Sequence, residues 1–172
     1  KAIITEMLII LFGFLFSIHL VTQNSIWLML LAFFAIQLQG TVFNYYYTIL
    51  RNNSEGGDTT SRIKESSFPI ALHGENQLLV NILFVCYTIF YGGFDKIIYS
   101  LDSKAKNSIS FPNWFMTFVS IYGLGFQLLL IGFMLAFGFI NFITEFIIIY
   151  SIFIFILIGI RKIVLPQKKS SQ

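Results

Sequence analysis

Charged side chains are scarce in this sequence. Asp, Glu, Lys and Arg together make up 11 % of its 172 residues, against about 25 % in an ordinary soluble domain. Hydrophobic residues make up 56 % of the chain, and the mean hydropathy is +0.79. No soluble fold could hide so much apolar surface, so the composition indicates an integral membrane protein.

The distribution of charge along the chain does not indicate nucleic acid as a partner. The formal net charge is +3, and the basic residues fall in the polar segments and at the ends of the chain. This distribution is typical of membrane proteins and differs from the clustered basic patch that binds nucleic acid. The expected partners are membrane lipids, and a homodimer is a further assembly to consider.

Several kinds of reactive site lack their residues. Cys86 is the single cysteine, which excludes an intrachain disulfide and a cysteine-based metal site. His19 and His73 are isolated, whereas zinc needs three or four ligands. The sequence has no HExxH motif and no P-loop, since the run 56–60 has no lysine to cradle phosphates.

Five long apolar runs dominate the rest of the chain. Backbone polar groups in lipid are satisfied only in helices or closed barrels, and continuous rather than alternating apolar runs favour helices. A span needs about 20 helical residues. We therefore predict an all-α transmembrane helix bundle that forms a single domain over residues 1–172. The runs cover residues 2–21, 26–50, 78–99, 114–137 and 142–160.

The turns at 22–25 and 138–141 contain no Lys or Arg, which sets the predicted topology. Basic residues instead follow the second run, follow the third run and close the last run. The positive-inside rule assigns these three basic regions, and both termini of the chain, to the cytoplasm.

The third run, residues 78–99, then has cytoplasmic flanks on both sides and cannot cross the membrane. We predict an interfacial or re-entrant helix there, which leaves about four spans. Gly92-Gly93 and the pair Asp95-Lys96 favour this interpretation, because a clean span rarely carries them. The alternative is that the third run does span and the charge bias misleads.

Polar residues within the runs follow helical spacing. Steps of three and four residues place them on one helix face. Two interpretations of such a polar stripe are open. Small and amide side chains pack helices together, or they line a polar cavity that opens to the cytoplasm. The stripes are Gln37, Gly40, Thr41, Asn44, Thr48 and Arg51 in the second run, Asn113, Thr117, Ser120, Gly123 and Gln127 in the fourth, and Glu6, Gly13 and Ser17 in the first.

The loop after the second run is the most distinctive polar segment. In residues 51–62, Arg51 and Arg62 flank glycines and hydroxyl side chains. Arginine binds phosphate bidentately, and glycines let a backbone approach an anion. The loop therefore suggests contact with a phosphorylated headgroup or nucleotide, and the alternative is a solvated turn beside anionic lipid. Glu145, near the outer end of the last run, is interpreted as an interfacial residue.

Three segments together resemble a known family. They are Gly-Thr-Val-Phe-Asn-Tyr-Tyr-Tyr at 40–47, Gly-Gly-Asp-Thr-Thr-Ser-Arg at 56–62 and Pro-Asn-Trp-Phe-Met-Thr at 112–117. They look like the C-terminal part of CDP-alcohol phosphatidyltransferase-like proteins, which join a CDP-linked donor to an alcohol in phospholipid synthesis. The resemblance implies six spans and a divalent-metal site that faces the cytoplasm. The spaced-Asp motif that defines the family is absent, and no Asp occurs before Asp58.

The chain starts at Lys1 and passes directly into an apolar helix, as would a fragment that begins just after that motif. We therefore expect the N-terminal part, with the ligands for Mg²⁺ or Mn²⁺, to lie upstream, and no catalytic residue to lie in this chain. The alternative is that only a few initial residues are missing. The candidate substrate-binding residues, chosen by position and chemistry, are Glu6, Asn44, Arg51, Arg62, Asn113 and Thr117.

Two other functions stay open at this point. The same polar stripes would suit a small transporter or channel component, for which Gln37, Gln127 and Glu145 would continue the path through the outer half. A non-catalytic membrane assembly subunit would explain every stripe by helix packing.

Overall fold

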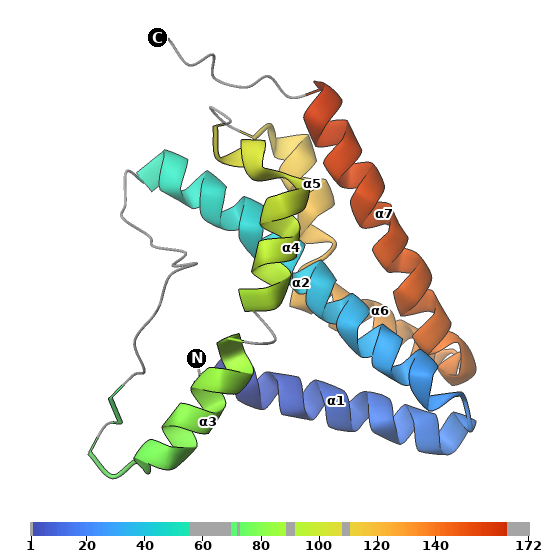
Figure 1. Ribbon diagram of the computed structural model, residues 1–172. Helices are drawn as coiled ribbons and strands as arrows, with labels where there is room; N and C mark the ends of the chain where they lie inside the picture. Colours follow the sequence, from blue (N-terminus) through green and yellow to red (C-terminus); the bar gives the residue numbers. More distant parts are fainter. Residues whose placement is uncertain (1, 56–69, 72, 89–91, 108–110, 165–172) are drawn as a thin grey trace, which may run out of the picture.

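The computed structural model describes residues 2–55, 70–71, 73–88, 92–107 and 111–164, and side chains within these ranges except at 2–6, 52–55 and 106–107. Every regular element in these ranges is helical, which confirms the predicted class (Figure 1). The helices are α1 (Ala2–Thr22), α2 (Ile26–Glu55), α3 (Gln77–Tyr87), α4 (Gly93–Leu101), η2 (Ser103–Asn107), α5 (Asn113–Ser120), α6 (Leu124–Ala136), η3 (Ile140–Phe142) and α7 (Ile143–Val164).

Two helical segments are long and apolar enough to cross a membrane. They are Ile26–Arg51 in α2 and Ile140–Val164, which is α7 with η3 before it. The pair α5 and α6 makes a third candidate if it counts as one bent span. In α1 the segment searched, Met7–Thr22, is shorter than a full span. The structure thus supports an integral membrane protein with two or three spans, and the number four stays a prediction.

The predicted fourth run is not one straight helix. It breaks between Ser120 and Leu124, and α5 and α6 are bent by 50°. A Cβ on Gly123 would lie 3.0 Å from the carbonyl oxygen of Ser120 and 3.6 Å from the ring of Phe43. The chain can therefore turn this tightly against α2 because residue 123 is a glycine. The polar stripe expected over 113–127 consequently belongs to two helices and not to one face.

The third run divides into two short helices, α3 and α4, of 11 and 9 residues. Neither reaches the roughly 20 residues that a span needs. The prediction is one interfacial or re-entrant helix, whereas the described residues of this run form two helices, and their position relative to the membrane stays a prediction. Asn76 caps α3, because its side chain accepts a hydrogen bond from the backbone N–H of Leu78 at 2.8 Å.

Both predicted tight turns are present. Between α1 and α2 the chain reverses at Gln23, whose φ is 57°. After α6, Gly138 takes a φ of 77°, and the N–H of Phe139 bonds the carbonyl of Met134 at 2.7 Å. This is the left-handed glycine cap that commonly ends a helix. The two turns lie close together, since Asn24 Nδ2 donates to the carbonyl of Asn141 at 3.3 Å.

The helices diverge from these turns (Figure 1). α2 lies at the centre and makes its most extensive contact with α7, while α1 packs on α2 and α3. One apolar core joins α1, α2, α6 and α7 nearer the turns. A second joins α2, α4, α5 and α7 at the far end, where α2 and α7 finish and α5 begins. We name this part of the bundle the Asp102 end, after the buried residue Asp102 that lies there.

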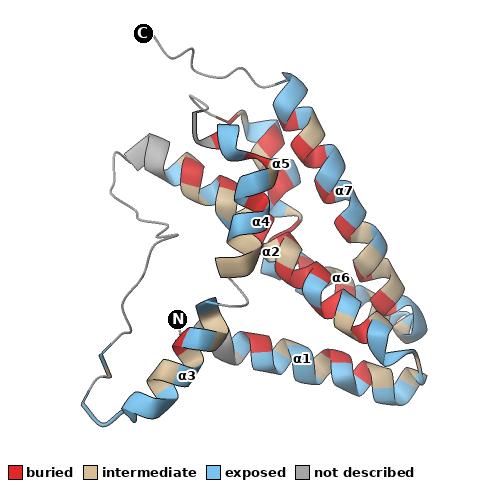
Figure 2. Cartoon of the chain, viewed as in Figure 1, coloured by how far each residue is buried: buried red, intermediate tan, exposed pale blue. Residues whose placement is uncertain are grey.

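Outward surfaces of the helices carry apolar side chains. Ile10, Trp27, Phe137 and Ile149 are all more than half exposed, and exposed residues are visible along α1 and α7 (Figure 2). A soluble protein rarely exposes so much contiguous apolar surface. Contact with lipid accounts for it.

Candidate functional site

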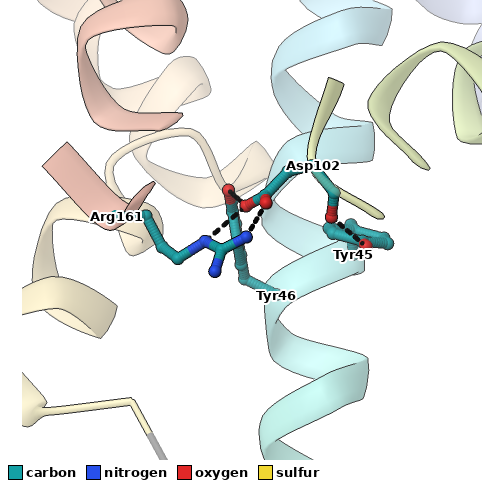
Figure 3. A network of polar contacts seen from close by, with 4 residues as sticks. All are labelled: Tyr45, Tyr46, Asp102 and Arg161. Carbon is teal, nitrogen blue, oxygen red and sulfur yellow. Dashed lines mark hydrogen bonds and ion pairs between the residues drawn. The ribbon is translucent and has the colours of Figure 1, made fainter. Parts of the chain in front are cut away.

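The Asp102 end contains a buried charge pair. Asp102 follows the last residue of α4 and is 1 % exposed, and Arg161 in the last turn of α7 is 0 % exposed. The Nε of Arg161 donates to Oδ2 of Asp102 at 2.6 Å, and Nη2 of Arg161 pairs with Oδ1 (Figure 3). A two-pronged contact of this kind fixes the plane of the carboxylate as well as its position.

Two neighbouring tyrosines of α2 complete the network. The hydroxyl of Tyr46 donates to Oδ2 of Asp102 at 2.7 Å, and that of Tyr45 donates to the backbone carbonyl of Asp102 at 2.7 Å. The ring of Tyr46 meets Phe111 and Phe115 edge-on, at centroid distances of 5.5 and 5.2 Å. The polar network is thus enclosed by aromatic side chains from α5 and the segment before it.

Burial makes the network sensitive to the loss of any member. Taking two charges out of water costs several kcal/mol per ion, which the mutual attraction offsets only when the geometry is good. The position of Arg161 helps, since a cation is favoured at a helix C-terminus. Its Nη1 has no hydrogen-bond partner among the described residues. The pair joins the end of α4 to α7, and Tyr45 and Tyr46 join it to α2, so one network links all three helices.

A second polar cluster lies nearer the middle of the bundle. Gln39 of α2 donates to Ser151 Oγ at 2.7 Å and to the carbonyl of Ile147 at 3.2 Å, both in α7. Gln127 of α6 donates to Gln39 Oε1 at 2.9 Å and to the carbonyl of Tyr122 at 3.2 Å. All three polar side chains are buried. This cluster fits the helix-packing interpretation given to Gln127.

The predicted substrate-binding residues are not members of the buried network, although Asn44 directly precedes Tyr45. Asn44 and Arg51 are exposed on α2, and Asn113 and Thr117 are exposed on α5. Thr117 Oγ1 donates to the carbonyl of Asn113 at 2.9 Å, so these two share a face of α5 one turn apart. The polar cavity inside the bundle, open to the cytoplasm, stays a prediction. Glu6 lies in α1 with its side chain outside the described atoms, and Arg62 lies outside the described residues.

The polar stripe predicted on α2 passes from buried to exposed along the helix. Gln37 and Thr41 are buried, and Thr41 Oγ1 donates to the carbonyl of Gln37 at 2.9 Å. Asn44 and Arg51, further along the same face, are exposed. The stripe thus serves helix packing in the middle of α2 and reaches the surface of the molecule toward the Asp102 end.

No metal site is visible in the described part of the chain. Those residues contain no group of three or more His, Cys, Asp or Glu side chains that could hold an ion. The described residues do not fit the divalent metal that the family resemblance implies. Ligands outside them remain a prediction.

The sequence reading missed Asp102 and Arg161. It took Arg161 as the start of a basic tail, although Ile163 and Val164 continue the apolar character beyond it and α7 extends through Val164. That continuation was the available signal that Arg161 lies within a helix. The partner gave no comparable signal, because Asp102 is 59 residues away and follows a short amphipathic helix.

Comparison of the chain with protein-family models, with curated proteins and with solved structures finds no match. The functional interpretation therefore rests on the residues and on their arrangement in the fold.

Proposed function

We propose that this chain is part of a membrane transferase of phospholipid synthesis. It would move a phosphatidyl or phospho-alcohol group from a CDP-linked donor to an alcohol. The acceptor hydroxyl forms a new O–P bond and gives up its proton, the P–O–P bridge of the donor breaks, and CMP leaves. In this function the chain forms the wall of the cavity that contacts the substrate, while the catalytic groups and metal ligands lie outside its described residues.

One structural observation carries the proposal. Two of the three segments that resemble the family, 40–47 and 112–117, are far apart in sequence but pack on each other at the Asp102 end. Tyr46 and Phe115 are both 0 % exposed, and their rings meet edge-on at 5.2 Å. The third segment, 56–62, lies outside the described residues. Motif segments that belong to one site should converge in this way.

The exposed residues at this end have suitable chemistry. Arg51 has a guanidinium group that binds phosphate oxygens bidentately. Asn44 lies two helical turns before it on the same face of α2, and its amide both donates and accepts hydrogen bonds. Both side chains are exposed, as a substrate contact requires.

A non-catalytic membrane assembly subunit is the second candidate. It is favoured by the observation that the buried polar side chains of the described residues bond mainly to one another across helices, as Gln39 does with Gln127 and Ser151. The transporter alternative draws less support, because Gln127, one of its proposed path residues, is engaged in this packing.

The test uses the full-length protein encoded by the gene, reconstituted in lipid nanodiscs with Mg²⁺ or Mn²⁺. CMP release is measured with CDP-diacylglycerol or a CDP-linked amino alcohol as donor, each with alcohol acceptors. We expect release that needs both metal and acceptor and that falls in Asn44→Ala and Arg51→Gln. Gln23→Asn, at an exposed position in the turn before α2, serves as the control, because Asn tolerates the positive φ of this residue. A monodisperse protein that releases no CMP with any pair contradicts the proposal and leaves the assembly subunit.

A further inference from the structure

The contacts between α2 and Asp102 have a geometric consequence. Successive residues of an α-helix lie about 100° apart around its axis. Tyr45 and Tyr46 therefore leave α2 in different directions, yet both hydroxyls reach Asp102, one at its backbone carbonyl and one at its side chain, at 2.7 Å each. Two points on the circumference of α2 are thus tied to one residue. The helix cannot rotate about its axis here without breaking at least one bond.

Asp102 is itself held from the other side. Arg161 of α7 contacts both carboxylate oxygens, and Arg161 is 0 % exposed. Without this contact, Asp102 would be attached only to α4 and η2, which have nine and five residues. Helices this short are not stable alone. Arg161 therefore holds Asp102 in place, and Asp102 in turn holds α2 through Tyr45 and Tyr46.

The face of α2 opposite these bonds carries the proposed substrate contacts. Asn44 directly precedes Tyr45, and Arg51 lies seven residues, or about two turns, after Asn44. Tyr46 is buried while Asn44 and Arg51 are exposed. Fixing the rotation of α2 on its buried side therefore also fixes the direction in which Asn44 and Arg51 point.

We propose that Asp102, held by Arg161, is a positioning residue that sets the rotation of α2 and so directs Asn44 and Arg51 toward the substrate. It acts through Tyr45 and Tyr46 and does not itself touch the substrate. The part of this inference that concerns turnover rests on the proposed transferase function. The part that concerns the rotation of α2 does not.

The decisive variant is Tyr45→Phe/Tyr46→Phe in the full-length protein. It frees α2 from Asp102 but leaves the ion pair with Arg161 and nearly all the aromatic packing intact. The matched control is Tyr150→Phe, which removes a phenol that donates to the carbonyl of Ile121 at 3.2 Å. A misplacement of about 1 Å can cost about 100-fold in rate.

Two readouts separate positioning from simple stability. The first is kcat/KM per folded protein, measured by CMP release, which we expect to fall about 10- to 100-fold in the double variant and little in Tyr150→Phe. The second is the alkylation rate of a cysteine at Asn44→Cys, measured with a water-soluble maleimide in a background in which Cys86 and any other cysteine of the full-length protein are replaced by Ser. We expect this rate to change several-fold when Tyr45 and Tyr46 become Phe, and to stay constant when Tyr150 does.

The outcomes distinguish the two proposals. Equal kcat/KM values in the double variant and in the Tyr150→Phe control, with equal alkylation rates, overturn the positioning role. If the full-length protein releases no CMP at all, the transferase proposal fails, and the alkylation rates alone then decide whether Asp102 sets the rotation of α2.

Discussion

The buried ion pair predicts an asymmetric response to mutation. Asp102→Asn leaves the guanidinium of Arg161 buried without a counter-charge, and a guanidinium cannot shed its proton in a protein. Breaking a buried pair in this way costs about 3–5 kcal/mol. The new amide still offers one acceptor to Tyr46 or to Arg161, so we expect a loss near 3 kcal/mol.

The opposite deletion should cost less. Arg161→Met leaves the carboxylate of Asp102 unpaired, but a carboxylate can bind a proton and become neutral where a guanidinium cannot. Met also fills much of the volume of the Arg stem. We therefore expect a loss of about 2 kcal/mol, below that of Asp102→Asn.

The double variant Asp102→Asn/Arg161→Met completes the cycle. Removing both charges avoids the penalty of an orphaned ion, and replacing a whole buried pair is often close to neutral. We expect it to lose about 2 kcal/mol, less than Asp102→Asn alone, which corresponds to a coupling energy of about 3 kcal/mol. A double variant that loses less than the sum of the two single losses is the specific mark of a buried pair, because the losses at two independent sites would add.

The assay is unfolding in mixed micelles with increasing SDS, followed by the fluorescence of Trp27 and Trp114. Glu145→Gln is a suitable control, because its carboxylate is only partly buried and accepts a bond from Thr144 at 2.9 Å. The reasoning is refuted if Asp102→Asn stays within about 1 kcal/mol of the wild type, or if the double variant loses the sum of the two single losses.

Three further predictions test the fold. Gly123→Ala should destabilise by about 1–3 kcal/mol, measured in the same SDS titration, because its Cβ would lie 3.0 Å from a backbone oxygen; an unchanged midpoint contradicts the break at residue 123. Gln39→Leu should cost about 1–2 kcal/mol, since it removes the donor to Ser151 Oγ and the acceptor of one N–H of Gln127, and the loss should shrink when Gln127→Leu is added. Burial raises the pKa of Asp95 above its ordinary 3.8. A raised pKa in the folded state favours folding at low pH, so stability falls as pH rises from about 3.8 through the folded pKa. The difference in melting temperature between wild type and Asp95→Asn should accordingly change as pH rises, and a difference that is the same at every pH would count against that burial.

The helical class and both tight turns could be predicted from the sequence. Continuous apolar runs leave only helices as spans, and the turns at Gln23 and Gly138 fall where those runs stop. The third run holds no helix of spanning length among its described residues, and the charge and paired glycines that interrupt it gave a signal of this in the sequence. These features depend on local composition, which the sequence displays directly.

The break at Gly123 and the buried network could not be predicted in the same way. Hydropathy stays high through residues 114–137, so the run gave no sign that the backbone turns by 50°. Glycine at 123 was read as part of a packing stripe, and its close approach to Phe43 depends on a helix far away in sequence. The pairing of Asp102 with Arg161 likewise depends on how α4 and α7 meet, which no local pattern encodes.

The candidate substrate residues were chosen by position and chemistry, and four of them can be compared with the structure. Asn44, Arg51, Asn113 and Thr117 are exposed on α2 and α5, the two helices whose family-like segments pack together. Their exposure is compatible with a substrate contact, but the buried network beside them was missed. Polar residues that bond to each other from different helices form no stripe at helical spacing, so the spacing of polar residues in the sequence does not reveal them.

Substrate protection tests the central claim most directly, because it asks whether the exposed face of α2 meets the CDP-linked donor. The full-length protein with Cys86→Ser and Asn44→Cys is treated with a water-soluble maleimide, with and without CDP-diacylglycerol or a CDP-linked amino alcohol. We predict that one of these donors slows alkylation at residue 44 several-fold, while a cysteine at Gln23 reacts at the same rate throughout. Equal rates at residue 44 with and without each donor would contradict the assignment of this face to the substrate.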